Sequence, residues 1–381
     1  MSLRILHVIG SLAMGGAEQM LAQVLPAIAA RGHSVTVLSL RGPYTLSDRL
    51  ERQGVRVIRA DATGRLGTLL TAVRQLRLAV EETGAMVVHA HFVTPITATA
   101  LLRQRREFAA CLTYHNLAYA PGVNKPGIGL EVRKRANRLA ARHGMDAHFA
   151  VSRAVADHYA HHMGLPELSI VPNPVNFERV DAALAEPEWP HGTGKDAVGI
   201  LLPGRLVPAK GHALFVEALR SLRGGTTPVQ AVFAGYGKQE ASLRSQIEEA
   251  GLGEDVLFTG EVSHDRMLRL MAGSDVVAVP SLAEGFGMTA LEAMAAGRAV
   301  VASKVGGLPE LVQHDRTGLL HETGSATELA SALRRVIVDR TLRHMLGATA
   351  REAARAYAVQ SVADLQIEHY RAMLDRRDGR G

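Results

Sequence analysis

The sequence is poor in cysteine, in aromatic residues and in long apolar runs. Its single cysteine, Cys111, excludes a disulfide framework and favours a reducing compartment. Aromatic residues are only 4% of the 381 residues, so few platforms exist for base stacking, which argues against a nucleic-acid partner. No run approaches the roughly 18 apolar residues of a membrane span. The short apolar start MSLRILHVIG predicts a buried strand rather than a signal peptide, and we therefore expect a cytoplasmic protein.

The positive charge is concentrated in the first half of the chain. Residues 1–185 hold 21 Lys and Arg against 13 Asp and Glu, whereas the remainder holds 22 against 24. A helix expected over residues 131–143 carries five of these cations: Arg133, Lys134, Arg135, Arg138 and Arg142. Such a helix presents either a solvated basic face or a contact with an anionic, lipid-linked acceptor or with the inner face of a membrane.

The second half contains a strand, loop, helix and strand in close succession. The apolar run Val276–Val279 ends at Pro280, and a loop with glycines follows. Good helix formers then extend from Thr289 to Ala296, and a second apolar run covers Ala299–Ala302. This order predicts a parallel crossover unit, in which ligands bind at the carboxyl ends of the strands.

The loop of this unit carries groups suited to a nucleotide sugar. The amides of Phe286, Gly287, Met288 and Thr289 are expected at a helix N-terminus, which favours an anion such as a diphosphate. Two carboxylates lie on either side, one before the helix and one inside it, with seven residues between them: Glu284 and Glu292. Carboxylates repel phosphate but accept hydrogen bonds from sugar hydroxyls. A crossover with two solvated glutamates remains the alternative.

Two cations occur in another strand-end loop, PGRLVPAKGH. Arg205 and Lys210 lie five residues apart on either side of a proline, so both can reach one diphosphate. There they would offset the charge of a leaving group. An isolated pair of this kind is otherwise solvated.

The chain begins with a strand, a glycine turn and a helix, as nucleotide-binding domains do. The turn at Gly15-Gly16 lacks the G-x-G-x-x-G pattern, which argues against a dinucleotide and therefore against a nicotinamide oxidoreductase. Further on, MVVHAH places His89 and His91 on one face of a strand, as half of a metal site would be. Because no third ligand lies nearby in the sequence, we interpret them as polar groups at a strand end.

Taken together, these motifs resemble those of the retaining glycosyltransferases of family 4, which have the GT-B fold. The resemblance rests on Glu284-x7-Glu292 with GFG between, on the GG-x-PE that follows, on Arg205-x4-Lys210 and on the early GG-x-E, and it covers essentially the whole chain. It implies an α/β protein of two Rossmann-like doubly wound domains facing across a cleft. We expect a first domain over 1–185, a donor-binding domain over 186–357 and a C-terminal helix, 358–381, that returns to the first domain.

The resemblance also implies roles for individual residues. Arg205 and Lys210 would hold the diphosphate, Glu292 the ribose hydroxyls and Glu284 the hydroxyls of the transferred sugar. His115, at the end of the strand Ala110–His115, would lie beside the anomeric carbon. The remaining residues of the expected donor site are Gly15, Gly16 and Glu18 over the phosphates, Val262 near the nucleobase, and Gly235, Gly285, Phe286, Gly287, Met288 and Thr289.

The implied reaction moves a hexose from a nucleotide sugar to an acceptor hydroxyl with retention of configuration. We favour a UDP-sugar over GDP-mannose, and an acceptor in cell-surface polysaccharide, lipopolysaccharide or glycolipid synthesis. No Asp-x-Asp occurs, so we expect no essential metal and no cofactor besides the donor. The alternatives are a nucleotide-sugar epimerase of similar fold, a transferase that uses a soluble natural-product acceptor, and a module that binds without turnover.

Overall fold

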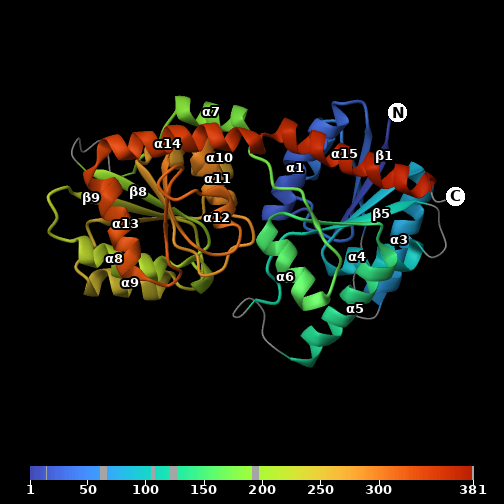
Figure 1. Cartoon of the computed structure of the whole chain (residues 1–381), viewed down its shortest axis with the longest axis horizontal. Helices are drawn as coiled ribbons and strands as arrows, with labels where there is room; N and C mark the ends of the chain where they lie inside the picture. The colour runs from blue at the N-terminus through green and yellow to red at the C-terminus, as the bar shows by residue number, and fades with distance from the viewer. Residues whose placement is uncertain (14, 61–66, 104–107, 121–126, 191–196, 380–381) are drawn as a thin grey trace. The chain divides into compact units, whose positions relative to one another are not determined.

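The chain folds into two compact units (Figure 1). The computed structural model describes all residues except 14, 61–66, 104–107, 121–126, 191–196 and 380–381. One unit combines Met1–Pro174 with Val359–Gly381, and the other is Val175–Ala358. The chain therefore leaves the first unit once and comes back to it with its last helix.

The first unit is built on a parallel sheet with the order β3-β2-β1-β4-β5-β6-β7. Its strands are β1 (Arg4–Ile9), β2 (Ser34–Ser39), β3 (Arg56–Arg59), β4 (Val87–His91), β5 (Ala109–Tyr114), β6 (Ala147–Ala150) and β7 (Ser169–Ile170). Its helices are α1 (Gly16–Ala29), α2 (Ser47–Arg52), α3 (Gly67–Thr83), α4 (Val93–Arg103), α5 (Ile128–Gly144), α6 (Arg153–Met163) and α15 (Val359–Asp378).

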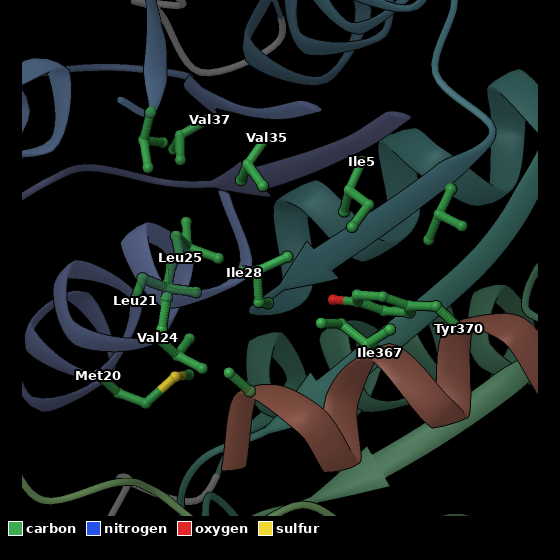
Figure 2. Packing of buried hydrophobic residues seen from close by; sticks show 14 of the residues in the cluster. Ile5, Met20, Leu21, Val24, Leu25, Ile28, Val35, Val37, Ile367 and Tyr370 are labelled. Carbon is green, nitrogen blue, oxygen red and sulfur yellow. The ribbon is translucent and has the colours of Figure 1, made fainter. Parts of the chain in front are cut away.

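The core of this unit joins α1 and α15 to one face of the sheet. Apolar residues recur on α1 at helical spacing, so Leu21, Leu25 and Ile28 are all buried. Figure 2 shows Tyr370 of α15 facing Ile28 and the strand that carries Ile5. At the surface, Arg31, just after α1, donates to the Asp364 carboxylate and to Gln360 of α15. The last helix is therefore an integral layer of the first unit.

The second unit has a parallel sheet with the order β10-β9-β8-β11-β12-β13. Its strands are β8 (Val198–Pro203), β9 (Val229–Ala234), β10 (Val256–Gly260), β11 (Val276–Val279), β12 (Ala299–Ser303) and β13 (Leu319–His321). Its helices are α7 (Phe177–Ala185), η1 (Pro208–Lys210), α8 (His212–Leu222), α9 (Glu240–Glu249), α10 (His264–Gly273), α11 (Met288–Ala295), α12 (Leu308–Leu311), α13 (Ala326–Val338), α14 (Arg340–Ala354) and η2 (Arg355–Tyr357).

The structure divides the chain after Pro174, whereas the sequence led us to expect a boundary after residue 185. The difference is α7, which packs on α10 and α11 of the second unit. Arg179 of α7 binds the Asp265 carboxylate of α10. Residues 191–196, which follow the boundary that we expected, lie outside the described residues.

Each sheet reverses its winding at one pair of neighbouring strands. The pair is β1 and β4 in the first unit, and β8 and β11 in the second. Ligands of doubly wound sheets bind outside the carboxyl ends of such strands. In the second unit these ends lead into the loops with Lys210 and with Glu284. Among the helices of the described part of the chain, none combines the length and the apolar character that crossing a bilayer requires.

Candidate active site

Three loops of the second unit meet at the carboxyl ends of β8, β9 and β11. A Cβ added to Gly211 would overlap the carbonyl oxygen of Pro280, and one added to Gly235 would overlap the carbonyl oxygen of Gly204. Only glycine allows backbones to approach this closely. These contacts bring the loop of Arg205 and Lys210 against the loops that follow β9 and β11.

Lys210 and Glu284 form an ion pair at this junction. The distance from Lys210 Nζ to Glu284 Oε2 is 2.6 Å, and the two side chains are only 26% and 15% exposed. The same carboxylate oxygen lies 3.5 Å from Ser281 Oγ. Lys210 and Thr289 both line a small cavity beside them. A cation and a carboxylate that the sequence places 74 residues apart are thus held together at the sheet edge.

The N-terminus of α11 opens at the same edge. Gly287 precedes the helix in the left-handed region, with φ of 106°, and no side chain caps it. The helix ladder starts with the bond from Leu291 N to Gly287 O, so the amides of Met288 and Thr289 have no acceptor inside the helix. The Phe286 side chain is buried and packs edge-on against Tyr357, so this residue can offer a ligand only its backbone.

Arg205 and Gly235 lie next to this group. The Arg205 side chain is exposed, and its backbone nitrogen is 3.5 Å from the Cβ position of Gly235. Gly285 lies between Glu284 and α11, and its carbonyl contacts the Gly307 position. The structure therefore brings together the phosphate-binding candidates of the second unit on adjoining loops.

Glu292 belongs to a second group, about one turn further along α11. Its Oε1 lies 2.7 Å from Nε2 of His264, the first residue of α10, and both side chains are largely buried. His264 follows Val262, which is half-buried, and Ser263, which caps α10. The other ring nitrogen of His264 is buried and has no hydrogen-bond partner among the described residues. Sequence analysis missed His264; its position two residues after Val262, at a helix start, was the available signal.

The remaining candidates belong to the first unit. Gly15 precedes α1, and the Glu18 carboxylate folds back over Gly15 at the start of that helix. Partial burial raises the pKa of Glu18. Gly16 is exposed at the first position of the helix. A phosphate approaching this turn would meet the Glu18 carboxylate unless the side chain moves.

A pocket of about 530 Å³ lies at the winding reversal of the first sheet. Its lining comes from the segments after β1, β2, β4 and β5 and from helices α1, α5 and α6. It includes Glu18, Arg41, Thr94, His115 and Asn137. The volume is within the range of small-molecule sites, roughly 300–1,000 Å³. The lining offers hydrogen-bond donors and acceptors, and it contains both a cation, Arg41, and a carboxylate, Glu18.

His115 is linked to a row of buried histidines. Its Nε2 lies 3.0 Å from His91 Nδ1, and His91 Nε2 lies 3.0 Å from His7 Nδ1. Burial lowers the pKa of His115 to about 4 and that of His7 to about 3, so both rings are neutral at neutral pH. Sequence analysis found no third histidine near His89 and His91. The parallel pairing of β1 with β4 supplies one, because it sets His7 opposite His89.

Two family models together cover most of the chain. The model described as "Glycosyltransferase Family 4" matches residues 14–179, and the model described as "Glycosyl transferases group 1" matches residues 187–353. The chain belongs to this family of group 1, family 4 glycosyltransferases, which confirms the resemblance seen in the motifs and makes the protein a nucleotide-sugar-dependent glycosyltransferase.

Two relatives illustrate the range of the family. The chain is similar to the GDP-mannose-dependent alpha-(1-6)-phosphatidylinositol monomannoside mannosyltransferase of Mycobacterium tuberculosis. The two are 30% identical over 338 residues, a match that covers 85% of this chain and 86% of the relative. It is 28% identical over 400 residues to the 2-deoxystreptamine N-acetyl-D-glucosaminyltransferase of Streptomyces fradiae, which covers 97% of this chain and 93% of the relative.

The fold is confirmed as GT-B by solved structures. The Anabaena protein HepE, crystallised with UDP-glucose, matches with a TM-score of 0.81 at 24% identity, over 97% of this chain and 99% of that one. At this identity the match speaks for the fold alone. The two parallel doubly wound sheets described above are the Rossmann-like halves that this fold requires.

Proposed function

We propose that the protein transfers a hexosyl group from a nucleoside diphosphate sugar, with a UDP-sugar favoured, to an acceptor hydroxyl with retention of configuration. The observation that carries this proposal is the meeting of the Lys210 ammonium with the uncapped N-terminus of α11. A cation and free helix amides at the end of parallel strands form an anion site. A diphosphate fits it because negative charge builds on the leaving group as the sugar departs.

The residues around this site take the following roles in the proposal. Lys210 and Arg205 bind the diphosphate, together with the amides of Met288 and Thr289. Glu284, which is paired with Lys210 in the absence of a donor, accepts hydrogen bonds from hydroxyls of the transferred sugar. Glu292 accepts from the ribose hydroxyls, and His264 orients its carboxylate by donating to one oxygen.

In the first unit, we assign His115 to the transferred sugar and the Gly15-Gly16 turn to the phosphates. The neutral His115 ring can accept a hydrogen bond from a hydroxyl without bringing a positive charge to the anomeric centre. For the turn to admit a phosphate, the Glu18 carboxylate has to move away from Gly15. The burial that raises the pKa of Glu18 also disfavours its charged form in this position, so a move toward solvent relieves that cost.

We place the acceptor in the pocket of the first unit and propose that it is a polyhydroxylated ring, either lipid-linked and anionic or free. The pocket offers hydrogen-bond donors and acceptors, among them Arg41, Thr94 and Asn137, that suit hydroxyl groups of such a ring. Both relatives are named for compounds that contain such a ring: inositol in one name and 2-deoxystreptamine in the other. Transfer to phosphatidylinositol in vesicles, to a water-soluble inositol phosphate and to 2-deoxystreptamine would distinguish the sources.

Helix α5 provides the surface for a peripheral membrane contact in this proposal. It exposes the cations Arg133, Arg135, Arg138 and Arg142, and beside them the apolar Val132 and Leu139 are 60% and 64% exposed. Exposed cations next to apolar side chains suit an anionic lipid surface. Co-sedimentation with vesicles rich in anionic lipid, and its loss in Arg135→Glu with Arg138→Glu, would support the contact; equal sedimentation of both proteins would exclude it.

We further propose that no metal ion is essential to the reaction. The charge of the departing diphosphate is offset by Lys210, Arg205 and the α11 amides in this scheme. Activity that persists in EDTA supports the proposal. Activity that EDTA abolishes and a divalent ion restores would refute it.

The donor is tested by thermal shift against UDP-, GDP-, ADP- and TDP-sugars, followed by a hydrolysis and transfer assay with the best ligand. Stabilisation by UDP-sugars alone supports the favoured base, whereas stabilisation by GDP-mannose alone overturns that choice. Lys210→Met should lower kcat by roughly 100- to 1,000-fold, as the loss of one oxyanion donor does. The matched control is Lys304→Met, which breaks an exposed lysine–glutamate pair of equal length, 2.6 Å, with Glu322.

A further inference from the structure

The first unit contains a continuous row of hydrogen bonds that runs from the last helix to His115. Tyr370 of α15 contributes its hydroxyl group, which lies 2.6 Å from His89 Nδ1 and 3.3 Å from His7 Nε2. From His7 the row continues through His91 to His115. Tyr370, His7, His89 and His91 are all fully buried, so these bonds are shielded from bulk solvent.

The arrangement is a hydrogen-bond row and not a metal cage. His7, His89 and His91 have ligand atoms within 4.8 Å of one another, as a metal site would. However, every ring nitrogen of the three already has a partner: His7 bonds Tyr370 and His91, His89 bonds Tyr370 and Thr113, and His91 bonds His7 and His115. Each of these nitrogens is thus already engaged, and an ion would have to displace these hydrogen bonds.

The direction that we assign to each bond starts from Gln366. Its amide nitrogen, which can only donate, lies 2.8 Å from the Tyr370 hydroxyl oxygen and 3.2 Å from His89 Nδ1. We assign Gln366 Nε2–H as a donor to His89 Nδ1, so that Nδ1 is an acceptor and carries no proton. The hydrogen between it and Tyr370, at 2.6 Å, must come from the phenol, and His89 donates through Nε2 to Thr113 Oγ1.

The remaining bonds are then fixed one after another. Because the Tyr370 hydroxyl gives its only hydrogen to His89, its oxygen accepts from His7 Nε2–H. His7 Nδ1 then accepts from His91 Nε2–H, and His91 Nδ1 accepts from His115 Nε2–H. His115 is left as the Nε2–H tautomer with an unprotonated Nδ1. That Nδ1 is buried and has no hydrogen-bond partner within the described part of the chain.

We infer that Tyr370 and Gln366 are positioning residues that hold His115, through His7 and His91, in the tautomer whose Nδ1 accepts a hydrogen bond from a substrate hydroxyl. The inference rests on the proposed role of His115 in the transfer reaction and specifies the atom that performs it. His115 lines the pocket of the first unit, and Nδ1 is the ring nitrogen that the row does not use. The opposite tautomer would offer an N–H where a hydroxyl needs an acceptor.

The row also gives the C-terminal helix a part in the site. Tyr370 lies 255 positions after His115, and no residue of α15 lines the pocket. Nevertheless, the hydroxyl of Tyr370 sets the direction in which three imidazole rings donate, those of His7, His91 and His115. Removing only this oxygen, in Tyr370→Phe, keeps the ring that packs against Ile28 and Ile367 (Figure 2). His7 Nε2–H then loses its acceptor, and the row is free to reverse.

The direct test is ¹⁵N NMR of histidine-labelled protein, with the His115 signals assigned by their loss in His115→Gln. We expect the wild-type protein to show His115 as Nε2–H with unprotonated Nδ1, and Tyr370→Phe to show a mixture of both tautomers. The matched control is Tyr44→Phe, which removes a hydroxyl that donates to the Ala60 carbonyl elsewhere in the same unit. A wild-type Nδ1–H tautomer, an unchanged tautomer in Tyr370→Phe, or a stoichiometric metal in the purified protein would each overturn the inference.

Kinetics provide a second readout. Tyr370→Phe should lower kcat roughly two- to tenfold, the effect of one misdirected hydrogen bond, with the KM of the donor unchanged. A rise in the KM of the donor without a fall in kcat would contradict the positioning role. The NMR result needs no substrate, so failure of the tautomer prediction and failure of the proposed transferase reaction can be told apart.

Discussion

Mild acid should destabilise the first unit through three histidines that fold as neutral rings. His7, His89 and His91 are completely buried. Burial lowers the pKa of His7 to about 3 and holds the pKa values of His89 and His91 well below their usual range. In the unfolded chain each would titrate near 6.5. Below about pH 6.5 the unfolded state therefore binds protons that the folded state does not bind.

The size of the effect follows from these pKa differences. Their stabilising contribution is complete above about pH 7.5 and is lost as the pH falls through 6.5 toward the pKa values of the folded state. Between about pH 7.5 and pH 5.5, each histidine lowers the free energy of unfolding by about 1.4 kcal/mol. This range extends one pH unit below the unfolded pKa of about 6.5, and one unit corresponds to about 1.4 kcal/mol. Three of them together cost about 4 kcal/mol, a large part of the roughly 5–15 kcal/mol that stabilises a typical domain.

The assay is denaturant unfolding at a series of pH values, for the wild type and for His89→Gln. Whatever this substitution does to the free energy of unfolding at neutral pH, it removes one proton from the difference between the two states. The slope of that free energy against pH should therefore be smaller in the variant by about 1 kcal/mol per pH unit near pH 5.5. Equal slopes would refute the reasoning, because they would mean that His89 is protonated equally in both states.

Three further substitutions test the fold and the site. Gly211→Ala should destabilise the second unit by more than about 1 kcal/mol, the usual cost of backbone strain alone, because its Cβ would also overlap the Pro280 carbonyl. Thermal unfolding measures this effect, and an unchanged Tm would contradict the loop contact. Glu292→Gln should weaken nucleotide binding by about 1.5–3 kcal/mol, since hydrogen bonds to a charged group are lost; calorimetry that finds wild-type affinity would exclude the ribose role. Arg31→Ala should cost only about 1 kcal/mol, because its ion pair with Asp364 is partly exposed; a loss several times larger would show that this pair anchors α15.

Local patterns in the sequence were enough to predict the elements around the proposed donor site. The apolar run Val276–Val279 is a strand as expected, and the glycine loop leads into α11 one residue earlier than predicted, at Met288. The match of two family models confirms the family that the motifs indicated. These features were predictable because periodicity, glycine positions and motif spacing all act over short stretches of chain.

What the sequence could not supply is the pairing of residues that lie far apart. The partner of Glu292 is His264, on a helix that begins 28 positions earlier, and the partner of His7 is His91, 84 positions later. Only the order of the strands and the packing of helices bring these side chains together. The same holds for the division of the chain after Pro174, which depends on where α7 packs and not on its composition.

The two carboxylates of the E-x7-E motif are engaged in different ways, and this difference bears on how a donor would be received. Glu284 is paired with Lys210, the same cation that we assign to the diphosphate. On the proposed roles, an arriving diphosphate draws Lys210 away from Glu284 and frees a carboxylate oxygen for a sugar hydroxyl. Glu292 bonds His264 through one oxygen, so its second oxygen can accept from the ribose without breaking that contact. On these proposed roles, the phosphate completes the sugar end of the site, whereas the ribose end is already formed before the donor binds.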